Sequence, residues 1–432
     1  MRFRPHVVFL YCKPKNNNMG KDSTKHLIGQ PIFKQVINII PKNVFDLLVI
    51  EHKSDRYYKS FSSWDQLVTL LFGILSRCDS MREVCDGMSS LGGKLNCLGM
   101  DCAPARSTAG DAMRDRNRQL FEDVYFALIK HFSTILSDCQ KKEEVSFDKF
   151  YVFDSTTITL FSDIMKGAGR NPKGNGKKKG GLKVHMMTDV HSDCAKYVTI
   201  SEAKQHDKNF LDKLNLPSGS MIAFDKAYNH YLQFARWTGQ GVNFVCRLKD
   251  NAVYQVQEED QKPLFEQTLS EEQHGVLKEE HIHMNYMENK RQKTLCLRKI
   301  TYKDEKKRIY EFITNNRDIS REEVALIYKY RWSIELVFKK LKQNFQLHFF
   351  YSETVNGIKT QVWCTLIAHL LLTVIKRLSK SNKAFSTVAA LIRIHLISHL
   401  DIYWVIENGR RLYAKRTRSR NKSPGSAQTT LF

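Results

Sequence analysis

Apolar residues recur every three or four positions in the first third of the chain, which is the period of an amphipathic helix. This pattern predicts helices at 32–40 (IFKQVINII), at 64–75 and across 105–136. Polar residues that can cap a helix stand near two of the predicted starts. We expect Ser63 to cap the second helix, and Ser107 or Thr108 to cap the third. The region 26–145 is therefore predicted to be helical.

The pattern changes at Lys149 to β-branched and aromatic runs that are typical of strands. The predicted strands are 149–161, 181–190, 196–204, 220–228 and 242–250. Short helical patterns precede the fourth and fifth strands, at 207–214 and 229–237. The resulting order, β-β-β-α-β-α-β, is the order of an α/β mixed sheet of the ribonuclease-H-like class.

Beyond this core, residues 250–318 are polar with short alternating runs, which indicates a β-rich insertion. A long helix follows, where Ser320 and Glu323 have the spacing of a capping box. A second apolar helix spans Val362–Ile375, too short for the roughly 17–25 residues that cross a bilayer, so we expect it in the core. The predicted divisions are a basic arm (1–25), the helical region (26–145), the core (146–249), the insertion (250–318), the rest of the core (319–380), a C-terminal helical region (381–407) and a basic tail (408–432).

Charge identifies the class of partner. The 432 residues include 68 Lys or Arg against 45 Asp or Glu, a net charge of +23. Such an excess indicates a polyanionic partner, with nucleic acid the first candidate and an anionic membrane surface the second. No segment is long and apolar enough to favour the membrane. The ten cysteines lack zinc-binding spacing, which favours reduced thiols in the cytoplasm.

Three acids stand out by position. Asp154 interrupts an apolar strand, Asp225 ends another, and Glu335 lies on the long helix among apolar neighbours. Each alone could be a cap or a solvated residue. Together they form a set of carboxylates suited to two divalent ions, Mg²⁺ or Mn²⁺, which would activate water and stabilise a leaving oxygen.

The helix around Glu335 carries the most specific pattern. Tyr328, Arg331, Glu335 and Lys342 are spaced by three, four and seven residues, so all four lie along one face. One acid and two cations on the same stripe could hold a phosphodiester beside the metal ions. The alternative is an amphipathic helix with ordinary charge pairs.

This pattern resembles the insertion sequence 4 family of bacterial DDE transposases, whose Y-(2)-R-(3)-E-(6)-K signature is matched in full at 328–342. FDST at Asp154 and DKAY at Asp225 look like the family's first two acidic motifs, with Lys226 where the family more often has Arg. The resemblance spans 154–342. It implies a ribonuclease-H-like catalytic domain with a β-rich insertion, catalytic and metal-binding roles for Asp154, Asp225 and Glu335, and excision through hairpin ends. More loosely, the helical N-terminal region resembles the family's DNA-binding region.

Other candidate DNA contacts are less specific. The Gly-rich stretch 166–183 holds seven cations and ends at Lys183, and is either a solvated loop or a loop that grips a DNA backbone. His185 is either a core residue or a neighbour of the acids. Trp332 is either part of the core or a surface on which an extruded base stacks, and we include it with Tyr328, Arg331, Lys342, Lys226 and Lys183 among the predicted DNA contacts.

The expected function is a transposase that cuts DNA at the ends of its own element and joins them to target DNA. Its partners would be double-stranded end and target DNA and, in that complex, a second copy of the chain. A bacterial, cytoplasmic and nucleoid-associated location follows from this reading. The alternatives are a metal-dependent nuclease on the same fold and a DNA-binding derivative that has lost catalysis.

Overall fold

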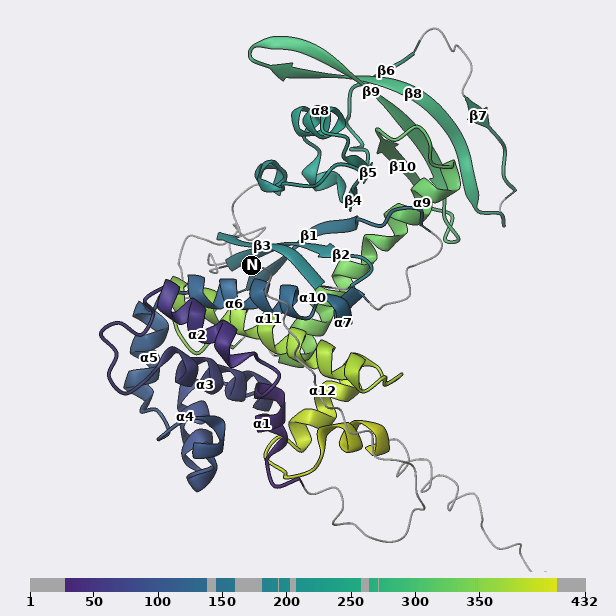
Figure 1. The fold of residues 1–432 in the computed structure, drawn as a ribbon. Helices are drawn as coiled ribbons and strands as arrows, with labels where there is room; N and C mark the ends of the chain where they lie inside the picture. The colour runs from purple at the N-terminus through teal and green to yellow at the C-terminus, as the bar shows by residue number, and fades with distance from the viewer. Residues whose placement is uncertain are drawn as a thin grey trace, which may run out of the picture.

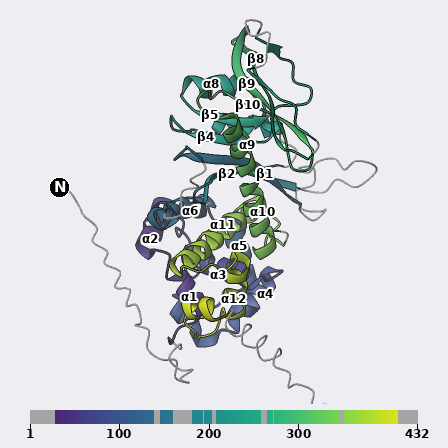
Figure 2. The same cartoon turned by 90° about the vertical axis from the view of Figure 1, so that its right-hand side faces the viewer.

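Helices from both ends of the chain form one helical body, against which the sheet packs (Figures 1 and 2). The computed structural model describes residues 28–137, 145–159, 181–192, 194–202, 207–257, 264–270, 272–345, 347 and 349–409. The N-terminal helices are α1 (Ile32–Ile37), α2 (Lys42–Glu51), α3 (Ser63–Ser76), α4 (Met81–Ser89), α5 (Arg106–Asp115), α6 (Gln119–His131) and α7 (Ser133–Ser137). The C-terminal helices are α11 (Val355–Leu378), α12 (Phe385–Ile394) and a last helix at 402–409.

Helix α11 is the central element of this body. It packs against α3, α5, α6 and α12, and almost all of its apolar side chains are buried. Within the described residues it alone has the length and hydropathy to cross a membrane, but 89% of its most apolar window is buried inside the protein. The prediction of a core helix here is confirmed.

Two details of the helical prediction are wrong. Ser62, not Ser63, caps α3, because the Ser62 side chain accepts from the Asp65 N–H while the Asp65 carboxylate accepts from the Ser62 N–H. The segment 105–136 is also not one helix, and neither Ser107 nor Thr108 is its cap, since α5 begins at Arg106. The chain leaves helical geometry at Arg116, whose buried guanidinium donates to backbone carbonyls near the start of α3.

The sheet has the order β3-β2-β1-β4-β5-β10-β9-β8-β6, with β7 paired to β8. Strands β1, β4 and β5 are parallel neighbours, and the other pairs are antiparallel, which gives the predicted mixed sheet. The strands are β1 (Phe150–Thr159), β2 (Gly181–Asp189), β3 (Cys194–Glu202), β4 (Met221–Phe224), β5 (Asn243–Arg247), β6 (Gln255–Val256), β7 (Phe265–Glu266), β8 (Gly275–Glu288), β9 (Arg291–Lys303) and β10 (Ile309–Thr314). Short helices η4 (Asp207–Lys213), η5 (Lys226–Tyr228) and α8 (Tyr231–Gly239) connect the core strands.

The segment predicted as a β-rich insertion extends the core sheet. Strand β10 pairs with β5 through Phe312 and Arg247, and the long β8–β9 hairpin continues outward from β10 (Figure 1). We call this β8–β9 hairpin the β arm. Its backbone hydrogen bonds therefore join it to the strands that carry the candidate site.

The predicted long helix runs from the sheet into the helical body as α9 (Arg321–Tyr330) and α10 (Trp332–Phe345) (Figure 1). The break falls at Arg331, whose N–H bonds to the Tyr328 carbonyl at 3.0 Å, three residues back. Ser320 caps α9 as predicted, but the Glu323 carboxylate accepts from Ser146. The predicted basic arm, residues 160–180 and the tail from residue 410 lie outside the described residues.

Candidate active site

Two parallel strands place the two aspartates side by side. Phe153 on β1 is paired with Phe224 on β4, so the next residue in each chain, Asp154 and Asp225, falls at the same level of the sheet. Both residues are half-buried. Like charges this close raise the free energy of the doubly ionised state, so the arrangement favours a cation nearby.

The residues Tyr328, Arg331, Glu335 and Lys342 lie along α9 and α10, which together we call the signature helix, and they face these aspartates. Arg331 Nη1 lies 2.9 Å from Asp154 Oδ2 and 3.0 Å from Glu335 Oε1. The Tyr328 hydroxyl donates to Asp225 Oδ1 at 3.3 Å, and Lys342 Nζ donates to the Thr157 carbonyl on β1 at 3.1 Å. The structure therefore brings the predicted stripe of α9 and α10 against β1 and β4.

Burial changes the acidity of Asp154. Removal of its carboxylate from water raises its pKa from the ordinary value of 3.8 to about 6. The Ser155 N–H and Arg331 oppose this rise, while the charges of Asp225 and Glu335 add to it. Arg331 is itself buried, with 7% of its side chain exposed, so it brings one positive charge into the centre of the carboxylates.

The carboxylates fit a cation. Asp154 and Glu335 already converge on one nitrogen of Arg331, and oxygen ligands of this kind suit Mg²⁺. Over the described part of the chain, no three His, Cys, Asp or Glu side chains are gathered closely enough to form a complete metal site. A divalent ion held by all three acids would therefore require Arg331 to move aside.

Two open hollows flank the acids. One, of about 440 Å³, lies between β1 and α10 and is lined by Asp154, Glu335, Lys339 and Lys342, among others. The other, of about 560 Å³, lies beside Asp225 and includes Lys226, Lys249 and Asp250. Lys226 Nζ is 2.7 Å from Asp250 Oδ2. Each side of the acid cluster thus offers lysines to an anionic ligand.

Trp332, Lys183 and His185, which the sequence also singled out, differ in how far they are exposed to solvent. Trp332 is 53% exposed, with its ring 5.1 Å from the Arg331 guanidinium, which excludes the core alternative and leaves the predicted stacking surface. Lys183 is buried on β2 opposite Thr157 and does not present its charge at the surface in this structure. His185 is a core residue, stacked 3.6 Å from the Phe210 ring, and burial lowers its pKa to about 3.

Sequence reasoning missed two lysines that line the hollows. Lys339 lies one turn beyond Glu335 on the same face of α10, a spacing that could have identified it. Lys249 follows buried strand β5, and charged residues at the end of a parallel core strand are a usable indication of a site.

Comparison with known proteins agrees with this geometry. The chain matches the family model of the transposase DDE domain over residues 146–371, and the model of a domain of unknown function (DUF4372) over residues 28–101. The first match covers just over half of the chain.

Three bacterial relatives carry transposase names. Protein y4zB of Sinorhizobium fredii, named as a proposed transposase, is 27% identical over 208 residues, which are 48% of this chain and 57% of the relative. The proposed transposases for insertion sequence elements IS5377 of Geobacillus stearothermophilus and IS4SA of Synechocystis are 24% and 21% identical. These matches cover 58% and 62% of this chain, and 64% and 70% of those relatives. The chain thus spans less than two thirds of the length of the first two relatives. Because the matching domain covers more than half of the chain, the protein belongs to the family of the transposase DDE domain.

Proposed function

We propose that the protein is a DNA transposase of the insertion sequence 4 type, which cleaves the ends of its own element and joins them to target DNA. One observation carries this proposal: Arg331 on the signature helix binds both the first aspartate of the motif, Asp154, and the glutamate, Glu335. The names of the relatives, which include two insertion sequence elements, agree with it.

The chemistry would be phosphoryl transfer with two Mg²⁺ or Mn²⁺ ions held by Asp154, Asp225 and Glu335. Bound divalent ions would supply Lewis-acid stabilisation and a nucleophile at neutral pH. The protein's own residues would place the scissile phosphodiester in the hollow between β1 and α10, where Lys339 and Lys342 face it. In-line attack by water would free a 3′-hydroxyl, which then attacks the opposite strand or the target.

The remaining signature residues would handle DNA that is distorted beside the cut. Exposed Trp332 next to Arg331 offers a flat apolar surface on which an unpaired base can stack, as a hairpin intermediate would require. Buried Tyr328 would act on the DNA only indirectly, by holding Asp225. Lys226 would contact phosphates of the strand that lies in the second hollow.

The other partners follow from the charge and the reaction. A chain at +23 binds DNA phosphates and repels a second copy, so end DNA is expected to bring two chains together as a dimer. The helical N-terminal region, predicted at 26–145, would bind the element ends. In a bacterial cell this protein would then be found with the nucleoid.

The test is end cleavage by the purified full chain. DNA from both sides of the coding region, with any inverted repeats, is incubated with Mg²⁺ and resolved on denaturing gels beside a scrambled duplex. A transposase gives cuts at the repeat boundary, hairpins and joined products only from the native sequence. Equal cutting of both duplexes without joining would identify a nuclease, and binding without cutting would identify an inactive derivative.

A further inference from the structure

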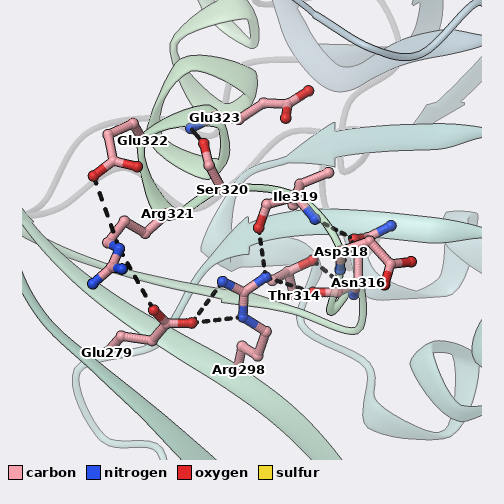
Figure 3. A network of polar contacts seen from close by, with 10 residues as sticks. All are labelled: Glu279, Arg298, Thr314, Asn316, Asp318, Ile319, Ser320, Arg321, Glu322 and Glu323. Atoms are coloured by element: carbon pink, nitrogen blue, oxygen red, sulfur yellow. Dashed lines mark hydrogen bonds and ion pairs between the residues drawn. The ribbon is translucent and has the colours of Figure 1, made fainter. Parts of the chain in front are cut away.

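A buried ion pair in the β arm lies away from the acids. Arg298 on β9 donates through Nε and Nη2 to Glu279 Oε1 on β8, at 2.8 and 2.6 Å (Figure 3). Each residue is 7% exposed. The third nitrogen, Nη1, donates outside the arm to the carbonyls of Asn316 and Ile319, at 3.0 and 2.9 Å. One guanidinium thus connects the arm to the loop between β10 and α9.

That loop leads directly into α9, which begins at Arg321. The Asn316 side chain accepts from the N–H groups of Asp318 and Ile319, at 2.9 and 3.0 Å, and donates to Asn243 at 3.1 Å. Ser320 then caps α9. Backbone and side-chain bonds therefore define the point at which α9 leaves the sheet.

Glu279 also approaches the helix itself. Its Oε2 lies 3.9 Å from Nε of Arg321, the first residue of α9. The Arg321 guanidinium packs 3.9 Å from the Phe265 ring on β7. The start of α9 is accordingly held from the arm by Glu279 and from the loop by Arg298.

A buried ion pair adds little stability over a well-packed apolar pair, because desolvation offsets its attraction. It does impose geometry, since the planar guanidinium directs each N–H. From Arg321 the helix reaches Arg331 after ten residues, about 15 Å along its axis. A shift at its start would move Arg331 and Glu335 relative to Asp154 on the sheet.

We propose that Glu279 and Arg298 are positioning residues: they set the start of α9 so that Arg331 and Glu335 meet Asp154. This gives the β arm a role in catalysis and rests on the proposed function. The competing explanation is that the pair only holds β8 to β9.

The experiment uses the full chain and end DNA. R298K keeps a positive charge beside Glu279 but loses the guanidinium nitrogen that donates to the carbonyls of Asn316 and Ile319. E279L/R298M replaces the pair by apolar side chains. The matched control is E280L/K299M, because Glu280 and Lys299 are adjacent in the same strands, equally buried and paired at 2.8 Å, but Lys299 donates to Tyr254 and Glu311 rather than to the loop.

Single-turnover cleavage, KM for end DNA, thermal midpoint and hydrogen exchange at amides 323 and 324, which donate to Ser320, are measured for each variant. R298K and E279L/R298M should cleave about tenfold to a hundredfold more slowly, with KM within about twofold of wild type and faster exchange at 323 and 324. The control should keep the wild-type rate and exchange.

Wild-type cleavage by R298K overturns the proposal, even if the double variant fails to fold. Equal slowing in the control also overturns it, because the effect would then be one of arm stability. If the wild type itself does not cleave end DNA, it is the proposed function that fails; the exchange comparison still tests whether the pair holds α9.

Discussion

Arg331 on the signature helix donates to Asp154 in the middle of β1, with 2.9 Å between Nη1 and Oδ2. The contact joins residues that are 177 positions apart and connects the junction of α9 and α10 to the sheet. The protein thereby supplies its own positive charge to a carboxylate that burial would otherwise protonate more readily. The same contact places a protein cation in competition with any divalent ion for Asp154 and Glu335.

Replacement of Arg331 should therefore have two opposite effects. R331A leaves Asp154 without its buried partner and should lower the free energy of unfolding by about 3–5 kcal/mol. Mg²⁺ should stabilise R331A more than wild type, since no guanidinium has to be displaced. Urea denaturation with and without Mg²⁺ measures both.

R114A is the control, because Arg114 pairs with Asp111 and Asp115 at exposed positions. Its unfolding midpoint should hardly change, and its response to Mg²⁺ should match wild type. A larger Mg²⁺ effect in wild type than in R331A would contradict this account of the site.

Asp154 should make stability depend on pH. Its folded pKa of about 6 lies above the ordinary 3.8, so the folded state holds the extra proton between these values. Stability contributed by the protonated carboxyl is thus lost as pH rises from about 4 to about 6. D154N, which stays neutral, should be more stable than wild type at pH 7 by about 1–3 kcal/mol. The difference between the two proteins should disappear near pH 4. Urea denaturation at several pH values measures it, and a difference in the free energy of unfolding that stays constant from pH 4 to pH 7 would refute this prediction.

Trp332 should act on distorted DNA rather than on folding. Because the side chain is exposed, W332A should keep the wild-type thermal midpoint. Loss of one stacked base should weaken binding to a duplex with an unpaired flanking base by about tenfold to a hundredfold, while intact duplex is bound as before. Fluorescence of 2-aminopurine at that base reports the stacking. W332F serves as the comparison, since Phe keeps a flat aromatic ring at the same position, and an equal loss in both variants would count against a stacking role.

The basic tail should contribute charge without sequence selectivity. Residues 408–432 carry seven Lys or Arg and no acid. Without these residues, the logarithm of the association constant for DNA should fall less steeply with the logarithm of the salt concentration, since the slope scales with the number of phosphates contacted. The preferred end sequence should stay the same. Titrations at several salt concentrations check this, and an unchanged slope would show that the tail does not touch DNA.

How much the sequence predicts depends on the range of the interaction. The face shared by Tyr328, Arg331 and Glu335 follows from helical spacing, and Asp154 stands out as a charge inside an apolar strand. The sequence did not indicate the break at Arg331, because the helical spacing continues through it and no Gly or Pro stands there. The pairing of Glu279 with Arg298 and the loop contacts of Arg298 depend on strand register and on chain contacts that local patterns do not contain.

Exposure was the least predictable property. The cation-rich stretch suggested an accessible Lys183, but pairing of β2 with both β1 and β3 places it within the sheet. Trp332 has a large apolar side chain of the kind that is usually buried, but it does not lie on the buried face of α10. That face is formed by Ile334, Val337, Phe338 and Leu341.

The central claim is that Asp154, Asp225 and Glu335 form one catalytic set. The most direct test measures Mg²⁺-dependent cleavage of end DNA by D154N, D225N and E335Q beside wild type, with binding to the same DNA measured in parallel. Each variant should lose cleavage by a factor of at least about 10³ and bind end DNA within a few-fold of wild type, because lysines outside the set contact the phosphates. Full cleavage by any one of the three variants would contradict the assignment.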